Sequence, residues 1–124
     1  MTKKELFSHA ATILPCTDME KCAKFYSEKL GFEITFQWGE PIDYIVLKRG
    51  EGVSIHLTKR SDQQTPSTSH VALYIFTHDV DALYEEYQKK DVSIHTPIET
   101  KEYGMRDFDV MDPEGHILAF GMGV

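Results

Sequence analysis

The chain of 124 residues has the length of one globular domain, and 41% of its residues are hydrophobic, which is enough for a core. Its net charge of −7 argues against nucleic acid as a partner, because phosphates attract basic surfaces. No apolar stretch approaches the ~18 residues of a transmembrane helix, and the N-terminus has no apolar signal-peptide core. The two cysteines are too few for a disulfide framework. We therefore expect a cytoplasmic protein with neither a membrane nor a nucleic-acid partner.

An internal repeat organises the sequence. The stretch DMEKCAKFYSEKLGFEI, which starts at Asp18, resembles DVDALYEEYQKKDVSI, which starts at Asp79. Apolar residues recur in both with helical spacing, which predicts two amphipathic helices. Thr17 and Glu20 have the spacing of a capping box at the start of the first helix, and Gly31 fits a left-handed stop at its end.

One extended stretch is expected before each helix and three after it. These stretches are rich in β-branched and aromatic residues and are bounded by Gly, Pro or Asp. In chain order, the expected strands are 10–15, 32–38, 44–48 and 53–58, then 70–76, 92–96, 106–111 and 116–120. The order β-α-β-β-β thus occurs twice. We expect one domain (1–124), made of a first module (6–60), a polar linker (61–69) and a second module (70–124), whose paired four-stranded sheets form a cavity.

Three motifs resemble the vicinal oxygen chelate superfamily in their order and spacing: LPCTDMEKCAKFYSEKLGFEI, HVALYIFTHDVDALYEEY and YGMRDFDVMDPEGHILAFG. This superfamily groups glyoxalase I, extradiol dioxygenases, fosfomycin-resistance transferases and bleomycin-resistance proteins, and the last motif looks most like the bleomycin-resistance branch. The resemblance implies an α+β fold of two βαβββ modules. It also implies a homodimer, because small members commonly build each cavity from modules of both chains.

Superfamily members with metal chemistry bind one divalent ion through side chains of the first and fourth strands of each module. Counting residues from the motifs places these ligand positions at Ala11, His56, Ala72 and Ala119. A methyl group donates no electron pair, and a catalytic ion needs about three nitrogen or oxygen ligands. We therefore expect no metal, no other cofactor and no catalytic residue. A two-residue shift of the strand at 70–76 would bring His70 to the position of Ala72, which still leaves only two histidines.

Strand alternation places His56 and Tyr74 on the faces that would enclose the cavity. His56 is either a hydrogen-bonding group for a ligand or a structural histidine. Trp38, the only tryptophan, either stacks on a planar ligand or packs at a sheet edge. Tyr44 and Phe108 align as equivalent positions of the two modules, so one is expected in the core and the other in the pocket wall.

The segment Tyr103-Gly-Met-Arg-Asp-Phe adds two candidates near the mouth of the cavity, Tyr103 and Arg106. Arg106 either binds an anionic group or forms a salt bridge with Asp107, Asp109 or an acidic residue of a partner chain. The predicted ligand-binding set is Trp38, Tyr44, His56, Tyr74, Tyr103, Arg106 and Phe108.

Charge is uneven along the chain. Residues 1–60 carry nine basic and eight acidic side chains, whereas residues 61–124 carry four basic and twelve acidic ones. An acidic half with cavity aromatics favours a metal-free protein that sequesters a small aromatic or cationic molecule, as bleomycin-resistance proteins do. Two alternatives stay open: a divalent-metal-dependent lyase or dioxygenase of the glyoxalase type, and a non-catalytic dimeric scaffold or regulator.

Overall fold

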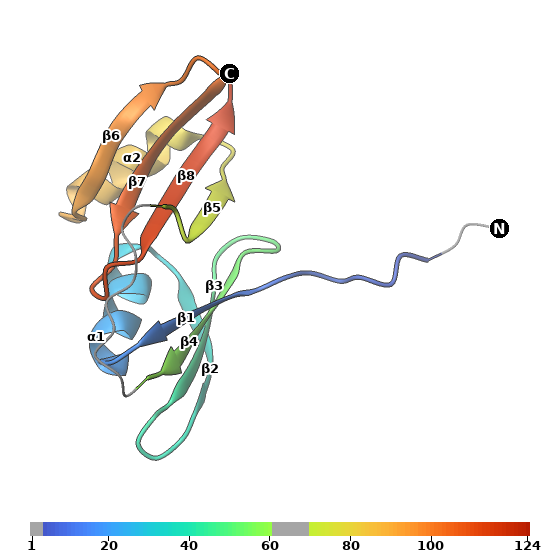
Figure 1. Cartoon of the computed structure of the whole chain (residues 1–124), viewed down its shortest axis with the longest axis vertical. Coiled ribbons are helices and arrows are strands. Elements are labelled where there is room, and N and C mark those ends of the chain that lie inside the picture. Colours follow the sequence, from blue (N-terminus) through green and yellow to red (C-terminus); the bar gives the residue numbers. More distant parts are fainter. Residues whose placement is uncertain (1–3, 61–69) are drawn as a thin grey trace.

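The computed structural model describes residues 4–60 and 70–124, which form two βαβββ modules (Figure 1). The first module comprises β1 (Thr12–Cys16), α1 (Met19–Lys24) with a π-helical continuation η1 (Phe25–Lys29), β2 (Glu33–Trp38), β3 (Tyr44–Lys48) and β4 (Ser54–Lys59). The second comprises β5 (Leu73–Phe76), α2 (Val80–Lys89), β6 (Ile94–Thr100), β7 (Met105–Met111) and β8 (Ile117–Gly123). The predicted α+β fold is confirmed, and the predicted linker at 61–69 lies outside the described residues.

Each module folds into one four-stranded sheet with the same topology. The strand order is β1-β4-β3-β2 in the first sheet and β5-β8-β7-β6 in the second. The first strand of each module runs parallel to the last strand, and the other neighbours are antiparallel. In Figure 1, α2 lies behind the second sheet and α1 lies beside the first. In the described residues, the other face of each sheet carries no helix, and we call these two surfaces the open faces.

The core fills the space between each sheet and its helix. Because side chains alternate along a strand, every second residue points to this helix side. Buried members on the strands of the first sheet include Leu14, Ile45, Leu47, Ile55 and Leu57, and on the second Phe108, Val110, Leu118 and Phe120. In residues 4–60 and 70–124, no helix has both the length and the apolar character that spanning a bilayer requires.

The turn between β7 and β8 holds the two modules together. Asp112 is buried, and its Oδ2 accepts a hydrogen bond from the hydroxyl of Tyr26 in the first module (2.7 Å). Its Oδ1 accepts from the backbone N–H groups of Glu114 (2.9 Å) and His116 (2.8 Å). His116 Nε2 in turn lies 2.9 Å from the carbonyl oxygen of Pro15. One aspartate therefore shapes the turn and fixes it to the other module.

The first helix is capped by Asp18, and the predicted capping box of Thr17 and Glu20 is wrong. The Asp18 side chain accepts a hydrogen bond from the backbone N–H of Lys21 (3.0 Å). The Thr17 hydroxyl instead lies 3.0 and 3.2 Å from the carboxylate oxygens of Glu114. Because the Thr17 hydroxyl bonds to the second module, it does not cap the helix. Asp18 instead accepts from a free N–H group of the first helical turn.

Candidate ligand-binding site

The open face of the first sheet carries a tyrosine–histidine pair. Tyr44 on β3 lies opposite Thr58 on β4, and the next position on this face pairs Val46 with His56. The Tyr44 hydroxyl and His56 Nδ1 are 2.5 Å apart and share a hydrogen bond, and the two rings meet edge to face. His56 thus has a protein partner, and the pair presents a polar group at the centre of the open face.

Two aromatic side chains of β2 lie beside this pair. Trp38 is opposite Tyr44, and Phe36 is opposite Val46, so both belong to the same open face. The Trp38 side chain is 63% exposed. Of the two roles expected for Trp38, this placement favours a stacking surface over edge packing, because its ring is not covered by other side chains of the described residues.

The open face of the second sheet carries a cluster of two tyrosines and an aspartate. The hydroxyls of Tyr74 (2.9 Å) and Tyr103 (3.2 Å) both donate hydrogen bonds to Oδ2 of Asp107. Burial, followed by the bond to Asp107, raises the pKa of Tyr74 above its ordinary value, so the hydroxyl keeps its proton. The rings of Tyr74 and Phe76 lie next to each other, with centroids 5.1 Å apart.

Phe108 and Arg106 lie on the opposite, helix side of the second sheet, away from the open face where the predicted ligand-binding set would need them. Phe108 is 1% exposed, stacks on Phe120 and meets the ring of Tyr87 beneath α2. The Arg106 guanidinium donates hydrogen bonds of 2.9 to 3.2 Å to the carboxylate of Asp81 on α2. A salt bridge was one of the two roles expected for Arg106, although Asp81 was not among its expected partners.

A one-residue error in aligning the two modules explains this difference. Tyr44 lies opposite Thr58 in the first sheet, as Asp107 lies opposite Gly121 in the second. The structural equivalent of Tyr44 is therefore Asp107 and not Phe108. A shift by one residue moves every side chain of a strand to the other face. Asp107 was thus overlooked as a site residue. A correctly placed gap in the alignment of the two modules would have matched it with Tyr44.

The residues present do not fit a catalytic divalent ion. The predicted ligand positions are Ala11, His56, Ala72 and Ala119. In the sheets, His56 lies opposite Ile13, and Ala119 lies opposite Tyr74, whose hydroxyl is already hydrogen-bonded. His70 precedes β5 and stays outside the register that would bring it to this position. Residues 4–60 and 70–124 contain no group of three or more His, Cys, Asp or Glu side chains suited to a metal ion. This donor set falls short of the three ligands that such an ion needs.

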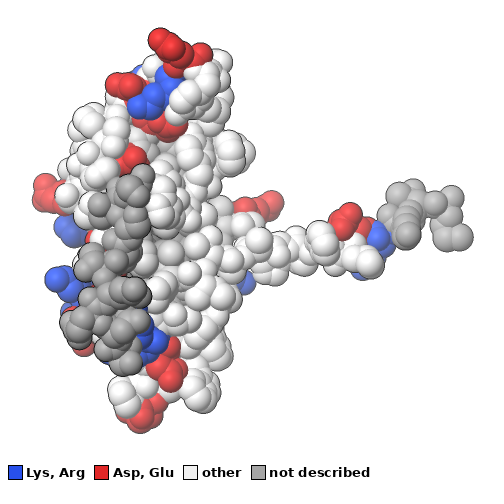
Figure 2. All heavy atoms as spheres, viewed as in Figure 1, with Lys and Arg blue, Asp and Glu red and all other residues white. Residues whose placement is uncertain are grey.

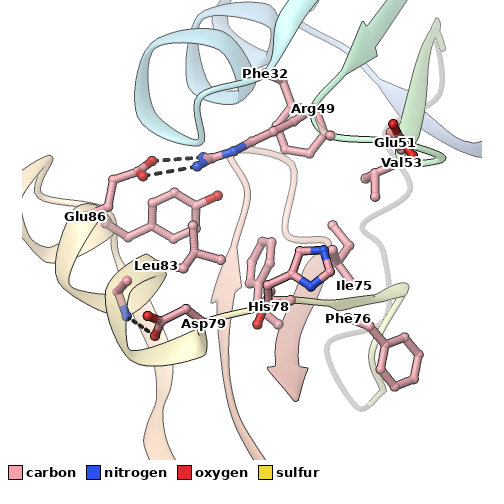
Figure 3. Close-up of a pocket in the computed structure, with 15 residues that line it drawn as sticks. Phe32, Arg49, Glu51, Val53, Ile75, Phe76, His78, Asp79, Leu83 and Glu86 are labelled. Carbon is pink, nitrogen blue, oxygen red and sulfur yellow. Dashed lines mark hydrogen bonds and ion pairs between the residues drawn. The ribbon is translucent and has the colours of Figure 1, made fainter. Parts of the chain in front are cut away.

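A cavity of about 340 Å³ lies at the seam between the two modules (Figure 3). Across one wall, Arg49 donates two hydrogen bonds to Glu86 (2.8 and 3.1 Å) and one to the carbonyl oxygen of Leu30 (2.7 Å). This pairing lowers the pKa of Glu86 and raises that of Arg49. At the opposite end, Asp79 caps α2. These polar groups satisfy one another, and none of the predicted ligand residues lines this cavity.

Five of the seven predicted ligand residues lie on the open faces, divided between the sheets. Trp38, Tyr44 and His56 belong to the first sheet, and Tyr74 and Tyr103 belong to the second. Within residues 4–60 and 70–124, no hydrogen bond or ring contact links the two groups. A single chain therefore presents two separate groups of candidate residues, one on each sheet.

The comparisons with known proteins agree with this fold. The model of the Glyoxalase/Bleomycin resistance protein/Dioxygenase superfamily matches residues 6–120. A bleomycin-binding protein from bleomycin-producing Streptomyces verticillus, solved with copper(II)-bleomycin, is 28% identical, with both chains fully covered and a TM-score of 0.72. TnmS3, an antibiotic binding protein from Streptomyces sp. CB03234, is 23% identical over 98% of this chain and 100% of its own, with a TM-score of 0.77.

A glyoxalase-related enzyme from Clostridium phytofermentans is 19% identical over 99% of this chain and 100% of its own, with a TM-score of 0.79. A search of curated proteins finds no match. Binding proteins and an enzyme thus share this scaffold, so the fold alone does not distinguish their functions. The family model covers nearly the whole chain, and the protein therefore belongs to the glyoxalase/bleomycin resistance protein/dioxygenase superfamily.

Proposed function

We propose that this protein binds and sequesters a small aromatic or cationic molecule without turning it over, as a member of the bleomycin-resistance-like branch. The observation that carries the proposal is the composition of the open faces. Each places exposed aromatic rings beside a hydrogen-bonded polar group, Tyr44–His56 on one sheet and Tyr74–Asp107 on the other. Flat rings with a few convergent polar groups suit a small planar guest. Two proteins of similar structure, a bleomycin-binding protein and an antibiotic binding protein, support the proposal.

We also propose that a second copy of the chain covers the open faces and completes the site. Figure 2 shows few charged side chains over the strands on the side in view. Large apolar side chains stand exposed on strands of both sheets, including Phe36, Trp38 and Phe76, and exposed apolar patches mark interaction surfaces. Residues 4–11 leave the body as an extended arm in Figure 1, with Leu6 87% and Phe7 88% exposed. Sedimentation velocity at micromolar concentration measures this association.

A thermal-shift screen with bleomycin, planar aromatic compounds and thiol conjugates tests the proposed binding. A guest present at 100 times its Kd stabilises the folded state by about 2.7 kcal/mol, which such a screen detects. Stabilisation by an aromatic or cationic compound is expected. A rise in melting temperature with divalent ions alone would instead favour the enzyme alternative, and no rise with any compound would favour the scaffold alternative.

Trp38→Ala is expected to weaken binding of a planar guest by about 1–3 kcal/mol, because the substitution removes the stacking ring. The folded state should change little, since this side chain is 63% exposed. Fluorescence titration of both proteins with the best compound of the screen measures the effect. Glu85→Ala, on the exposed side of α2, is the control and should bind as the wild type does. Equal affinity of Trp38→Ala and wild type would remove Trp38 from the site.

A further inference from the structure

The Asp107 carboxylate is a buried charge with one oxygen left free. Asp107 is 8% exposed. The hydroxyls of Tyr74 and Tyr103 both donate hydrogen bonds to the same carboxylate oxygen, Oδ2. Within residues 4–60 and 70–124, Oδ1 accepts no hydrogen bond, and it is not sealed from solvent. The carboxylate is therefore held in place through one oxygen, while the other receives no hydrogen bond from the described residues.

No cation of residues 4–60 and 70–124 forms an ion pair with this carboxylate. Lys101 is bound to Glu99 (3.0 Å), which is the main cause of its raised pKa, and the charge of Asp107 adds to that rise without a direct contact. Arg106 is adjacent in sequence, but its guanidinium is on the helix side and is bound to Asp81. A carboxylate taken out of water is unfavourable unless a cation compensates its charge, and neutral tyrosine donors compensate it only in part. A positively charged group at Oδ1 would supply what the protein does not.

Gly121 leaves room for the contact between Tyr74 and Asp107. Gly121 lies opposite Asp107 in the sheet, and a Cβ built on Gly121 would lie 2.1 Å from the Tyr74 hydroxyl and 2.8 Å from Asp107 Cβ. Any side chain at this position would therefore push Tyr74 away from the carboxylate. The absence of a side chain at Gly121 therefore leaves room for the hydrogen bond between Tyr74 and Asp107. Groups that already hold their binding geometry lose little conformational entropy when a ligand binds.

We propose that Asp107 is the residue that selects cationic guests, with its free Oδ1 receiving an ammonium, guanidinium or cationic ring nitrogen. The aromatic body of the guest lies against the neighbouring rings, and Tyr74 and Tyr103 act as positioning residues. Two other carboxylates of this sheet already have partners: Glu99, directly opposite Asp107, is paired with Lys101 (3.0 Å), and Asp109 is paired with His95 (2.8 Å), so neither competes for the cation. Aromatic rings next to a carboxylate favour a planar cation over a neutral molecule of the same shape. This inference rests on the proposed function and names the class of guest.

A matched pair of fluorescent probes tests the inference: acridine, which is neutral at pH 8, and N-methylacridinium, which carries a permanent positive charge. Titration of the wild type should give at least tenfold tighter binding of N-methylacridinium. Asp107→Asn, which keeps the size of the side chain, should lose this preference and bind the cation at least tenfold more weakly, while the affinity for acridine changes less than twofold. Asp109→Asn is the control on the same strand and face, and it should retain the preference.

The neutral probe guards against a change in folding. A misfolded Asp107→Asn protein would lose both probes, so an affinity for acridine that changes less than twofold assigns the lost cation binding to the charge. Equal binding of both probes by the wild type would overturn the assignment of Asp107 while leaving the proposed sequestration intact. A preference that persists in Asp107→Asn would also overturn it. Binding of neither probe would count against both proposals.

Discussion

Replacing Phe108 with alanine is expected to lower the free energy of unfolding by about 3–5 kcal/mol, the range found for large aromatic residues in well-packed cores. Phe108 is fully buried between the second sheet and α2. Its ring stacks on Phe120 and meets Tyr84 and Tyr87 edge to face, so the substitution leaves a cavity among three aromatic rings. Urea denaturation followed by circular dichroism measures the loss.

Trp38→Ala is the comparison for this prediction, because it also removes a large aromatic side chain but from an exposed position. Its free energy of unfolding should stay within about 1 kcal/mol of the wild type. The two variants therefore separate a core residue from a candidate binding residue. A Phe108→Ala protein as stable as the wild type but unable to bind the guest would return Phe108 to the ligand site.

Asp112→Ala is expected to lower the free energy of unfolding by about 3 kcal/mol, because it leaves three donors without their acceptor. These are the hydroxyl of Tyr26 and the backbone N–H groups of Glu114 and His116. Burial, together with Asp112, raises the pKa of Tyr26, so its hydroxyl keeps a proton that needs an acceptor. Thermal and urea denaturation measure the effect.

Tyr26→Phe is the graded control for the Asp112 prediction. It removes only the hydrogen bond between Tyr26 and Asp112 and leaves the turn around Asp112 intact, so the expected loss is smaller, about 1–2 kcal/mol. The exposed variant Glu85→Ala should be near neutral. An Asp112→Ala protein as stable as Glu85→Ala would show that this turn does not hold the modules together.

The secondary structure was largely predictable because it depends on local patterns. The expected strand 44–48 coincides with β3, and the two expected helices form within the repeated stretches that start at Asp18 and Asp79. These features follow from residue periodicity and turn chemistry within a short stretch. The role of Thr17 was not predictable in this way, because its partner Glu114 lies 97 residues further along the chain. A local rule assigns Thr17 to a helix cap, and a tertiary contact overrides it.

The candidate site was predictable on the first sheet and less so on the second. The alternation of side chains along the strand of His56 predicted the face on which His56 lies, because β3 and β4 pair without a gap. On β7, one misplaced gap in the alignment of the two modules matched Tyr44 with Phe108 instead of Asp107. The residue chosen therefore lies on the helix side of the sheet and not on the open face. No pattern in the sequence indicates that Tyr74 and Tyr103 share one carboxylate oxygen, since that depends on the space left by Gly121.

Binding of N-methylacridinium to protein treated with a chelator and then dialysed tests the central claim of metal-free binding most directly. The affinity of the treated protein should equal that of untreated protein, and elemental analysis of the untreated protein should find no stoichiometric Ni, Zn, Mn or Fe. Loss of binding after chelation, with recovery when one divalent ion is restored, would contradict the account.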